Sequence, residues 1–168
     1  MINVVPFIYE MVDELYANTY LLSDSENNCV VIDPAKDYPG IVNYIKKNNL
    51  KLKAVLLTHG HVDHMRGVDT LVNAFHVPVY IGFDDLDMLK DTFTNCSEFL
   101  GENVTVKAKA ETLADNEVLH LLKEDIQVIS TPYHTAGGVC FYLKDSGLLF
   151  TGDFMRNNLK LFILLPNI

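Results

Sequence analysis

Four side chains that can bind metal ions gather in one short stretch of the chain, LLTHGHVDHMRG at residues 56–67. The stretch holds half of the chain's six histidines and one aspartate: His59, His61, Asp63 and His64. Neutral imidazole and carboxylate are the usual protein ligands of zinc and of non-haem iron or manganese. So many polar groups are too crowded to be buried with a separate hydrogen-bond partner each. A metal site is therefore favoured over a surface loop that is rich in histidine.

The spacing of these residues indicates a loop that leaves the end of a strand. A helix would scatter positions i, i+2, i+4 and i+5 over several sides, and a strand would place the last on the opposite face. The preceding residues 53–58, KAVLLT, are predicted to form a short buried strand. Loops at strand ends are where rigid scaffolds present functional groups, and Gly60 and Gly67 allow tight turns. We therefore predict that the loop turns all four side chains toward one point.

Two further side chains that suit a metal follow predicted strands later in the chain. His134 comes just after IQVIST at residues 126–131, and Asp153 ends LLFTGD at residues 148–153. A solvated loop histidine and a turn aspartate are the ordinary alternatives for these two residues. Because both follow strand ends, as the first cluster does, we predict that they close the metal site from across the fold.

Three more residues have side chains that could belong to the site. Asp33, in VVIDP, either forms a turn with its own backbone or orients a ligand histidine through a hydrogen bond, and we favour the second role. His76 and His120 lie in ordinary amphipathic segments and are not assigned to the site.

The elements that must position these residues are predicted from the pattern of apolar residues. Before the motif we predict strands at residues 3–9, 18–24, 29–34 and 53–58, the second and third forming a hairpin, and a helix at 38–50. After it we predict helices at 65–76 and 84–95 and strands at 77–82, 104–108, 117–122, 126–131, 138–143 and 148–153. Two groups of strands with helices between them favour an α/β fold in which helices cover the outer faces of sheets.

Composition limits the class of protein and its partners. The 168 residues are predicted to form a single domain, 1–168, with 49% hydrophobic residues to build a core. A net charge of −9 argues against nucleic acid or an anionic membrane as a partner and leaves a small-molecule substrate. We expect a cytoplasmic protein, because neither a signal peptide nor an apolar run of ~20 residues is seen. Three separated cysteines indicate reduced thiols: Cys29, Cys96 and Cys140.

Three motifs together resemble a known family. THGHVDH at residues 58–64, TPYHTAGGVCFY at 131–142 and LFTGD at 149–153 occur in the order that is typical of the metallo-β-lactamase superfamily. In detail they are similar to its glyoxalase II-like branch, which is also called hydroxyacylglutathione hydrolase-like. The early NTYLL and VVIDP segments resemble the start of that branch, so the resemblance spans residues 17–153.

The resemblance implies a four-layer αββα sandwich with a two-metal site at one edge of the paired sheets. The first metal would be held by His59, His61 and His134. The second metal would be held by Asp63 and His64, and Asp153 would bridge both metals.

Hydrolysis is the chemistry that such a site would perform. Two divalent ions, most readily zinc with iron or manganese as alternatives, would lower the pKa of a shared water toward ~7. The metal-bound hydroxide would attack the carbonyl carbon of a small thioester or ester, and the metals would hold the developing oxyanion. Asp63 would orient this hydroxide and accept its proton, which makes it the predicted catalytic residue. A thiolate leaving group would need no separate strong acid.

The chain departs from the glyoxalase II-like pattern after Asp153. That branch continues with a GR-D segment, a helix and a strand that carries one more histidine, whereas here the sequence runs TGDFMRNNLKLFILLPNI. We therefore expect an incomplete C-terminal part and a weak second metal site. The apolar tail at residues 159–168 would either cover the exposed core or pair with a second molecule as an added strand, and we expect a homodimer or larger assembly. Two alternatives stay open: a mononuclear iron enzyme similar to sulfur dioxygenases, and a truncated paralogue that binds metal without catalysis.

Overall fold

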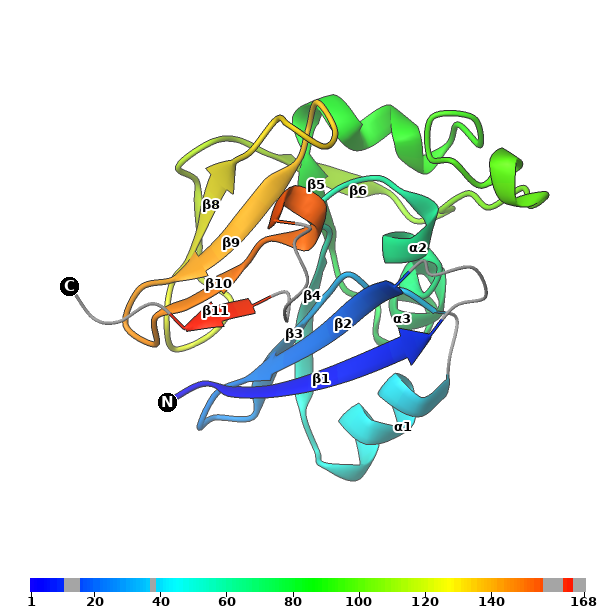
Figure 1. Ribbon diagram of the computed structural model, residues 1–168. Coiled ribbons are helices and arrows are strands. Elements are labelled where there is room, and N and C mark those ends of the chain that lie inside the picture. Colours follow the sequence, from blue (N-terminus) through cyan, green and yellow to red (C-terminus); the bar gives the residue numbers. More distant parts are fainter. Residues whose placement is uncertain (11–15, 37–38, 156–161, 165–168) are drawn as a thin grey trace.

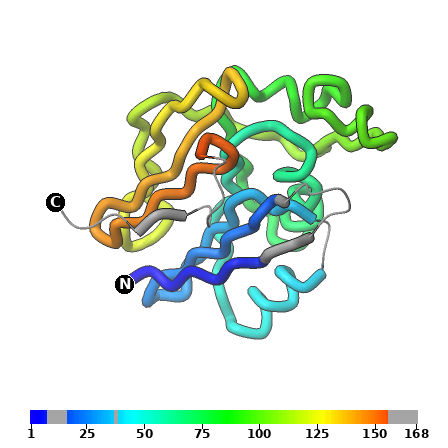
Figure 2. The backbone as a smooth tube through the Cα atoms, in the orientation of Figure 1, coloured from blue at the N-terminus to red at the C-terminus, as the bar shows by residue number. Residues whose placement is uncertain are grey.

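Two β-sheets packed face to face form the centre of the protein (Figure 1). The computed structural model describes residues 1–10, 16–36, 39–155 and 162–164. The backbone forms the first five strands of one sheet, passes through a lobe of short 3₁₀ helices, adds the last strand of that sheet and then enters the second sheet (Figure 2). The fold is of the predicted α/β class.

The first sheet contains six strands in the order β1-β2-β3-β4-β5-β6. Their bounds are β1 (Asn3–Glu10), β2 (Tyr16–Ser23), β3 (Asn28–Ile32), β4 (Lys51–Leu56), β5 (Val79–Gly82) and β6 (Ala110–Leu113). The pairs β1–β2 and β2–β3 are antiparallel, and the second of them is the predicted hairpin. The strands from β3 to β6 run parallel to one another. The carboxyl ends of four neighbouring strands therefore meet at one edge of this sheet.

The second sheet contains five antiparallel strands in the order β11-β10-β9-β8-β7. Their bounds are β7 (Val118–Leu119), β8 (Ile126–Ser130), β9 (Val139–Leu143), β10 (Leu148–Phe150) and β11 (Phe162–Leu164). Both β8 and β10 run antiparallel to β9, so they point the same way and end at the same edge. The apolar tail is described only over β11, which pairs with β10 of the same chain; the rest of the tail lies outside the described residues.

A continuous apolar core fills the space between the two sheets. Leu22 and Leu56 of the first sheet pack in one cluster with Phe141 and Phe150 of the second. The rings of Tyr20 and Phe150 lie 5.2 Å apart across this interface. Alternate residues of a strand point to opposite faces of its sheet, so Val30 and Ile32 of β3 enter this core while Val31 faces the other side.

A second core lies between the first sheet and two helices, α1 (Pro39–Lys47) and α3 (Val68–Phe75). Ile41 and Ile45 share one face of α1 because they are four residues apart, and Leu71 buries the corresponding face of α3. Figure 1 shows both helices on the side of the first sheet that faces away from the second. The described residues thus supply the helix, sheet and sheet layers of the predicted αββα sandwich.

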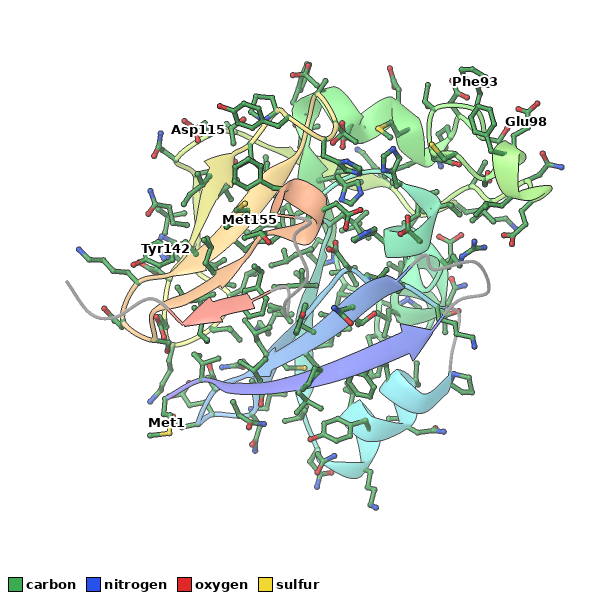
Figure 3. All side chains as sticks on the ribbon, in the orientation of Figure 1. Met1, Phe93, Glu98, Asp115, Tyr142 and Met155 are labelled. Carbon is green, nitrogen blue, oxygen red and sulfur yellow. The ribbon has the colours of Figure 1, made fainter. Side chains whose placement is uncertain are left out.

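The lobe between β5 and β6 differs from the prediction. A helix was expected over residues 84–95, but the structure has a 3₁₀ helix, η1 (Phe83–Leu89), and then turns and a second 3₁₀ helix, η2 (Glu98–Leu100). The carboxylate of Asp91 accepts a hydrogen bond from the backbone of Phe93 at 2.9 Å, a local turn that competes with helix continuation. Phe93 and Glu98 mark the tip of this lobe (Figure 3).

Two of the predicted strands are also wrong in extent or position. Residues 104–108 form no strand, because the Asp69 carboxylate takes up the backbone N–H groups of Lys107 and Ala108 at 2.8 to 3.0 Å. The sheet is extended instead by β6, which the sequence pattern missed. The strand expected at 117–122 is limited to β7, after which the backbone bends and Lys123 donates to the carboxylate of Asp24. The other predicted strands and helices are confirmed, with shifts at their ends.

The state of the cysteines and the length of the helices can also be described. All three cysteines are free, and two of them, Cys29 and Cys140, are buried. No helix in the described part of the chain is long and apolar enough to cross a membrane.

Candidate metal centre

Five strand ends converge where the two sheets meet. In the first sheet, parallel strands β3, β4 and β5 are followed by Asp33, His59 and Asp85. In the second sheet, β8 is followed by His134 and β10 by Asp153. The sheets are joined at this edge by a hydrogen bond from the backbone N–H at the start of β9 to the carbonyl just beyond β4, 2.8 Å long. Residues from both halves of the chain therefore share one site.

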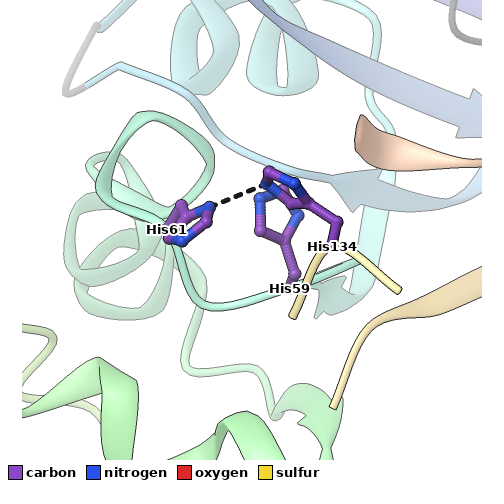
Figure 4. Close-up of side chains that lie close together, drawn as sticks. All are labelled: His59, His61 and His134. Carbon is purple, nitrogen blue, oxygen red and sulfur yellow. Dashed lines mark hydrogen bonds between the residues drawn. The ribbon is translucent and has the colours of Figure 1, made fainter. Parts of the chain in front are cut away.

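Three histidines form the first group of candidate ligands: His59, His61 and His134. One ring nitrogen from each lies within 4.8 Å of the others. Figure 4 shows the three rings turned toward one another, with Nδ1 of His61 2.9 Å from Nε2 of His134. Burial lowers the pKa of His61, and the neighbouring His134 lowers it further. The neutral imidazole that a metal requires is therefore favoured.

A second group joins His59 to His64 and Asp153, again with ligand atoms within 4.8 Å of one another. The His64 side chain is fully buried, and its Nε2 makes no hydrogen bond. Its neighbours there are carboxylate oxygens of Asp153 at 3.4 Å and Asp63 at 3.6 Å. Buried polar atoms nearly always have a hydrogen-bond partner. A buried imidazole nitrogen facing two carboxylates fits a divalent cation.

Asp153 lies between the two groups. Its Oδ1 faces Nε2 of His64 at 3.4 Å, and its Oδ2 faces Nε2 of His134 at 3.5 Å. Each oxygen thus addresses a histidine of a different group, as a bridging ligand would. Asp63 is beside His64 but belongs to neither group of mutually close ligand atoms. The fold brings all six predicted residues together, while His59 is common to both groups rather than restricted to the first.

The motif around these histidines is not the simple loop that its spacing predicted. His61 is extended, with φ −73° and ψ 148°, and it precedes a short helix, α2 (Val62–Met65). This turn forms because Val62 and Met65 are buried apolar residues, and the backbone N–H of Val62 donates to the carbonyl of Asn95 at 2.9 Å. The extended part presents the first two histidines, and the helical turn brings Asp63 and His64 inward.

Asp33 makes the predicted contact with a candidate ligand. Its Oδ2 lies 2.9 Å from Nδ1 of His64, and it also accepts the Thr58 hydroxyl at 2.6 Å, while Oδ1 accepts the Thr58 backbone N–H at 2.8 Å. This contact directs Nε2 of His64 toward the cluster. Asp33 itself has a positive φ of 49°, a conformation that aspartate tolerates better than most residues.

The two histidines that the sequence left unassigned lie outside both groups. His76 caps the end of α3 in a left-handed conformation, with φ 54° and ψ 49°. His120 is exposed and pairs with Asp125 at 2.6 Å. Asp85, by contrast, was not among the predicted site residues, yet its carboxylate is fully buried beside the histidine loops. Its position after a strand parallel to β3 and β4 is the signal that could have identified it.

An aromatic pair borders the cluster on its open side. The ring of Tyr133, which precedes His134, lies 5.4 Å from the ring of Phe154, which follows Asp153. Phe154 belongs to a 3₁₀ helix, η3 (Gly152–Met155), and lines a small hollow together with His59 and His134. Tyr133 is 81% exposed. A ligand that enters the hollow would therefore meet an apolar edge beside the candidate metal ligands.

Comparison with known proteins agrees with this geometry. The family described as "Metallo-beta-lactamase superfamily" matches residues 12–166. The "Probable metallo-hydrolase YqgX" of Bacillus subtilis is 32% identical over 145 residues, which cover 86% of this chain and 68% of the relative. A "Hydroxyacylglutathione hydrolase" of Prochlorococcus marinus is 31% identical, and the match covers 88% of this chain but 54% of the relative. The chain thus spans about half the length of this relative.

Solved structures resemble the same part of the chain. The BLEG-1 B3 metallo-beta-lactamase aligns with a TM-score of 0.78 at 30% identity, covering 90% of this chain and 71% of that one. TTHA1623, solved in a di-iron-bound form, aligns with a TM-score of 0.73 at 27% identity, covering 88% and 70%.

Proposed function

The chain belongs to the metallo-beta-lactamase superfamily, and we propose that it is a metal-dependent hydrolase of small thioesters or related esters. The main support is the placement of Asp153, whose two oxygens face His64 and His134 at 3.4 and 3.5 Å. A carboxylate between two histidine groups is suited to holding two cations close together. Relatives named as a probable metallo-hydrolase and as hydroxyacylglutathione hydrolases support hydrolysis and a thioester substrate.

The candidate ligands would hold the metals from both sheets. His59, His61 and His134 offer three imidazole nitrogens for one ion, and His64 with Asp153 offers ligands for a second. When bound, two divalent ions would lower the pKa of a shared water and polarise the substrate carbonyl. Zinc suits this mixture of nitrogen and oxygen ligands, and iron is the alternative suggested by the di-iron form of TTHA1623.

The remaining residues would orient the reactants and move the proton. The buried carboxylate of Asp63, next to His64, would accept a proton from the attacking water. Asp33 would hold His64 in the tautomer that leaves Nε2 available for a ligand bond. A thiolate leaving group needs little protonation, so these groups suffice for thioester cleavage.

The aromatic pair would contact the apolar part of the substrate. Tyr133 and Phe154 flank two of the candidate ligands, so an acyl chain could lie on their rings while its carbonyl reaches the cluster. Aromatic side chains supply large apolar contact areas in binding sites. Replacement of Tyr133 by alanine should therefore raise KM for thioesters with a long acyl chain more than for acetyl thioesters.

A thioester assay combined with metal analysis tests the proposal. The purified protein is loaded with zinc or iron, its metal content is measured, and hydrolysis of a series of acyl thioesters is followed by thiol release. We expect about two metals per chain and turnover that is lost in His61→Ala. His120→Ala is the matched control, since this histidine is exposed and lies outside both ligand groups.

Three outcomes would contradict the proposal in different ways. Equal turnover by the wild type and His61→Ala would show that the hydrolysis does not depend on this site. One bound iron per chain without thioester turnover would favour an enzyme similar to sulfur dioxygenases. Bound metal without any turnover would favour a non-catalytic metal-binding protein.

A further inference from the structure

We propose that Asp85 is a positioning residue that ties together the two loops carrying the candidate histidine ligands. The inference rests on the proposed metal centre. Among the described hydrogen bonds, Asp85 makes none to the side chain of a candidate ligand, so it would act through the loops. Asp85 lies in η1, just beyond β5, and is completely buried, with an exposed fraction of 0%. A carboxylate buried to this degree is unfavourable unless hydrogen bonds stabilise it.

Three hydrogen bonds satisfy the Asp85 carboxylate. Its Oδ2 accepts from the backbone N–H of Gly60 at 3.0 Å and from the hydroxyl of Thr135 at 2.7 Å. Its Oδ1 accepts from the backbone N–H of Gly137 at 2.7 Å. Two of the three donors are backbone groups of loops, which have no strand partner to satisfy them. The carboxylate therefore supplies the acceptors that a neighbouring strand would supply to these N–H groups in a sheet.

The donors are adjacent to the candidate ligands in sequence. Gly60 separates His59 from His61, and Thr135 directly follows His134. The first loop leaves the first sheet and the second loop leaves the second sheet. One side chain thus connects the two loops across the join between the sheets, and it sets how far apart their histidines lie. In the structure, Nδ1 of His61 and Nε2 of His134, one from each loop, lie 2.9 Å apart.

Close packing around Asp85 shows that both loops are pressed against η1. A Cβ atom at Gly60 would lie 2.6 Å from Cβ of Met88, and one at Gly137 would lie 2.3 Å from the backbone nitrogen of Asp85. Real Cβ atoms do not approach other atoms so closely, so only glycine fits at either place. The two glycines and the carboxylate form one tight contact, which leaves the loops little freedom to move apart.

Replacement of Asp85 by asparagine removes this connection while keeping the side-chain shape. The amide NH₂ group cannot accept a hydrogen bond. If it faces Gly60, the backbone N–H of Gly60 loses its acceptor, and if it faces Gly137, the N–H of Gly137 does. The neighbouring Asp84 is exposed, so Asp84→Asn makes the same change of charge on the same helix at a side chain that faces solvent.

The first experiment measures metal binding by the folded protein rather than activity. Cobalt(II) affinity is determined by competition with a chelator, and its absorption spectrum is recorded, at a temperature where circular dichroism shows all variants folded. We expect Asp85→Asn to weaken cobalt binding by about 10–100-fold and to alter the spectrum, because supporting residues of metal ligands have effects of this size. Asp84→Asn should match the wild type. Wild-type affinity and spectrum in Asp85→Asn would overturn the inference.

A second readout needs no metal. Amide hydrogen exchange of the metal-free protein, followed by NMR, should show faster exchange of Gly60 or Gly137 in Asp85→Asn, with unchanged protection in the sheet cores. If the wild type binds no cobalt, the proposed function fails, whereas the exchange experiment still tests the connection between the loops. Unchanged exchange at both glycines would overturn the inference by itself.

Thr135 provides a milder variant in case Asp85→Asn does not fold. Thr135→Val removes one hydrogen bond to the carboxylate, while Thr135→Ser keeps the hydroxyl group. We expect Thr135→Val to shift the cobalt spectrum and lower the affinity, and Thr135→Ser to restore both. Equal spectra and affinities for the valine variant and the wild type would count against the positioning role.

Discussion

At the residue scale, His64 is the candidate ligand whose surroundings constrain it most. One ring nitrogen contacts Asp33 at 2.9 Å, and the other faces carboxylate oxygens of Asp153 and Asp63. The orientation of the ring is therefore fixed before any metal binds. Its neighbours are drawn from three separate segments of the chain, so the site is defined by contacts that no single motif contains.

Removing the acceptor on Asp33 should weaken the metal held by His64. In Asp33→Asn, an amide NH₂ facing Nδ1 would no longer hold the His64 tautomer, and metal affinity should fall by about 10–100-fold. Zinc titration should show one class of site weakened and the other, which includes His61 and His134, less affected. Asp125→Asn is the control, because Asp125 is an exposed partner of His120. Two unchanged sites in Asp33→Asn would show that its contact with His64 is not needed.

The charge state of His64 leads to a prediction about pH. Burial opposes its protonation, but the carboxylates of Asp33, Asp153 and Asp63 raise the pKa of His64 well above its usual value. In the metal-free protein this raised pKa contributes stability that is complete below the unfolded value of about 6.5 and is lost as pH rises through the folded value. Denaturant unfolding of metal-free protein should therefore show this loss, and His64→Gln should lack it.

Metal binding is linked to the same proton. Because a metal displaces the proton of a protonated histidine, binding near neutral pH should release protons, and affinity should fall as the pH is lowered. Calorimetric zinc titrations in two buffers with different heats of ionisation measure the number released. If the heat of zinc binding is the same in both buffers, no proton is released on binding, and the predicted protonation of His64 is wrong.

At the scale of elements, the site depends on how strands end. The parallel strands β3, β4 and β5 place Asp33, His59 and Asp85 at one edge, because carboxyl ends of parallel strands lie side by side. The last candidate ligand, Asp153, is delivered by the turn after β10. That turn requires Gly152, which has φ +50° and lies against Thr58, just beyond β4.

A methyl group at Gly152 should destabilise the protein through a steric clash as well as through backbone strain. In Gly152→Ala, the new Cβ would lie 2.3 Å from the hydroxyl oxygen of Thr58, which is itself fixed by Asp33. Gly101 also has a positive φ, +72°, but nothing lies within 4 Å of the place for its Cβ. Gly101→Ala should cost roughly 1 kcal/mol of unfolding free energy and leave metal affinity unchanged.

Gly152→Ala should cost more than that amount and should also weaken metal binding, because Asp153 would be displaced. Denaturant unfolding and zinc titration of the two variants give the comparison. If the two alanine variants lose equal stability and both bind metal normally, the close approach of Gly152 to Thr58 has no role in the site.

At the scale of the whole molecule, the two sheets form one unit that holds the halves of the site together. Phe141 is completely buried between them and packs with residues of both sheets. Replacing a buried phenylalanine by alanine removes apolar contacts and leaves a cavity, at a cost of about 3–5 kcal/mol. Phe141→Ala should show this loss in denaturant unfolding.

Phe83 provides the matched control for that measurement, since its side chain is 70% exposed. Phe83→Ala should change the unfolding free energy by less than about 0.5 kcal/mol. A similar small effect for Phe141→Ala would mean that the interface between the sheets contributes little to stability. The homodimer inferred from the apolar tail concerns residues mostly outside the described part of the chain, and it stays a prediction.

The family, the positions of most strands and the six candidate metal ligands could be predicted from the amino-acid sequence. They could be predicted because the spacing of apolar residues and the motifs at strand ends can be recognised within a short segment of the sequence. Local signals failed in the lobe between β5 and β6, where the helix expected over 84–95 is a 3₁₀ helix and where β6 was missed. There, side chains of Asp69, Asp85 and Asp91 take up backbone N–H groups from the turns and loops around them.

Only the tertiary structure decided how the ligands are grouped and what supports them. It placed His59 in both groups, set Asp153 between His64 and His134, and buried Asp85 against two glycines. The resemblance implied the bridging place of Asp153, and the strand before Asp85 is a signal for its position, but the contacts themselves have no local signature, because they join residues from different strands or sheets. Their distances depend on the packing of one sheet against the other, which is fixed only when the whole core has formed.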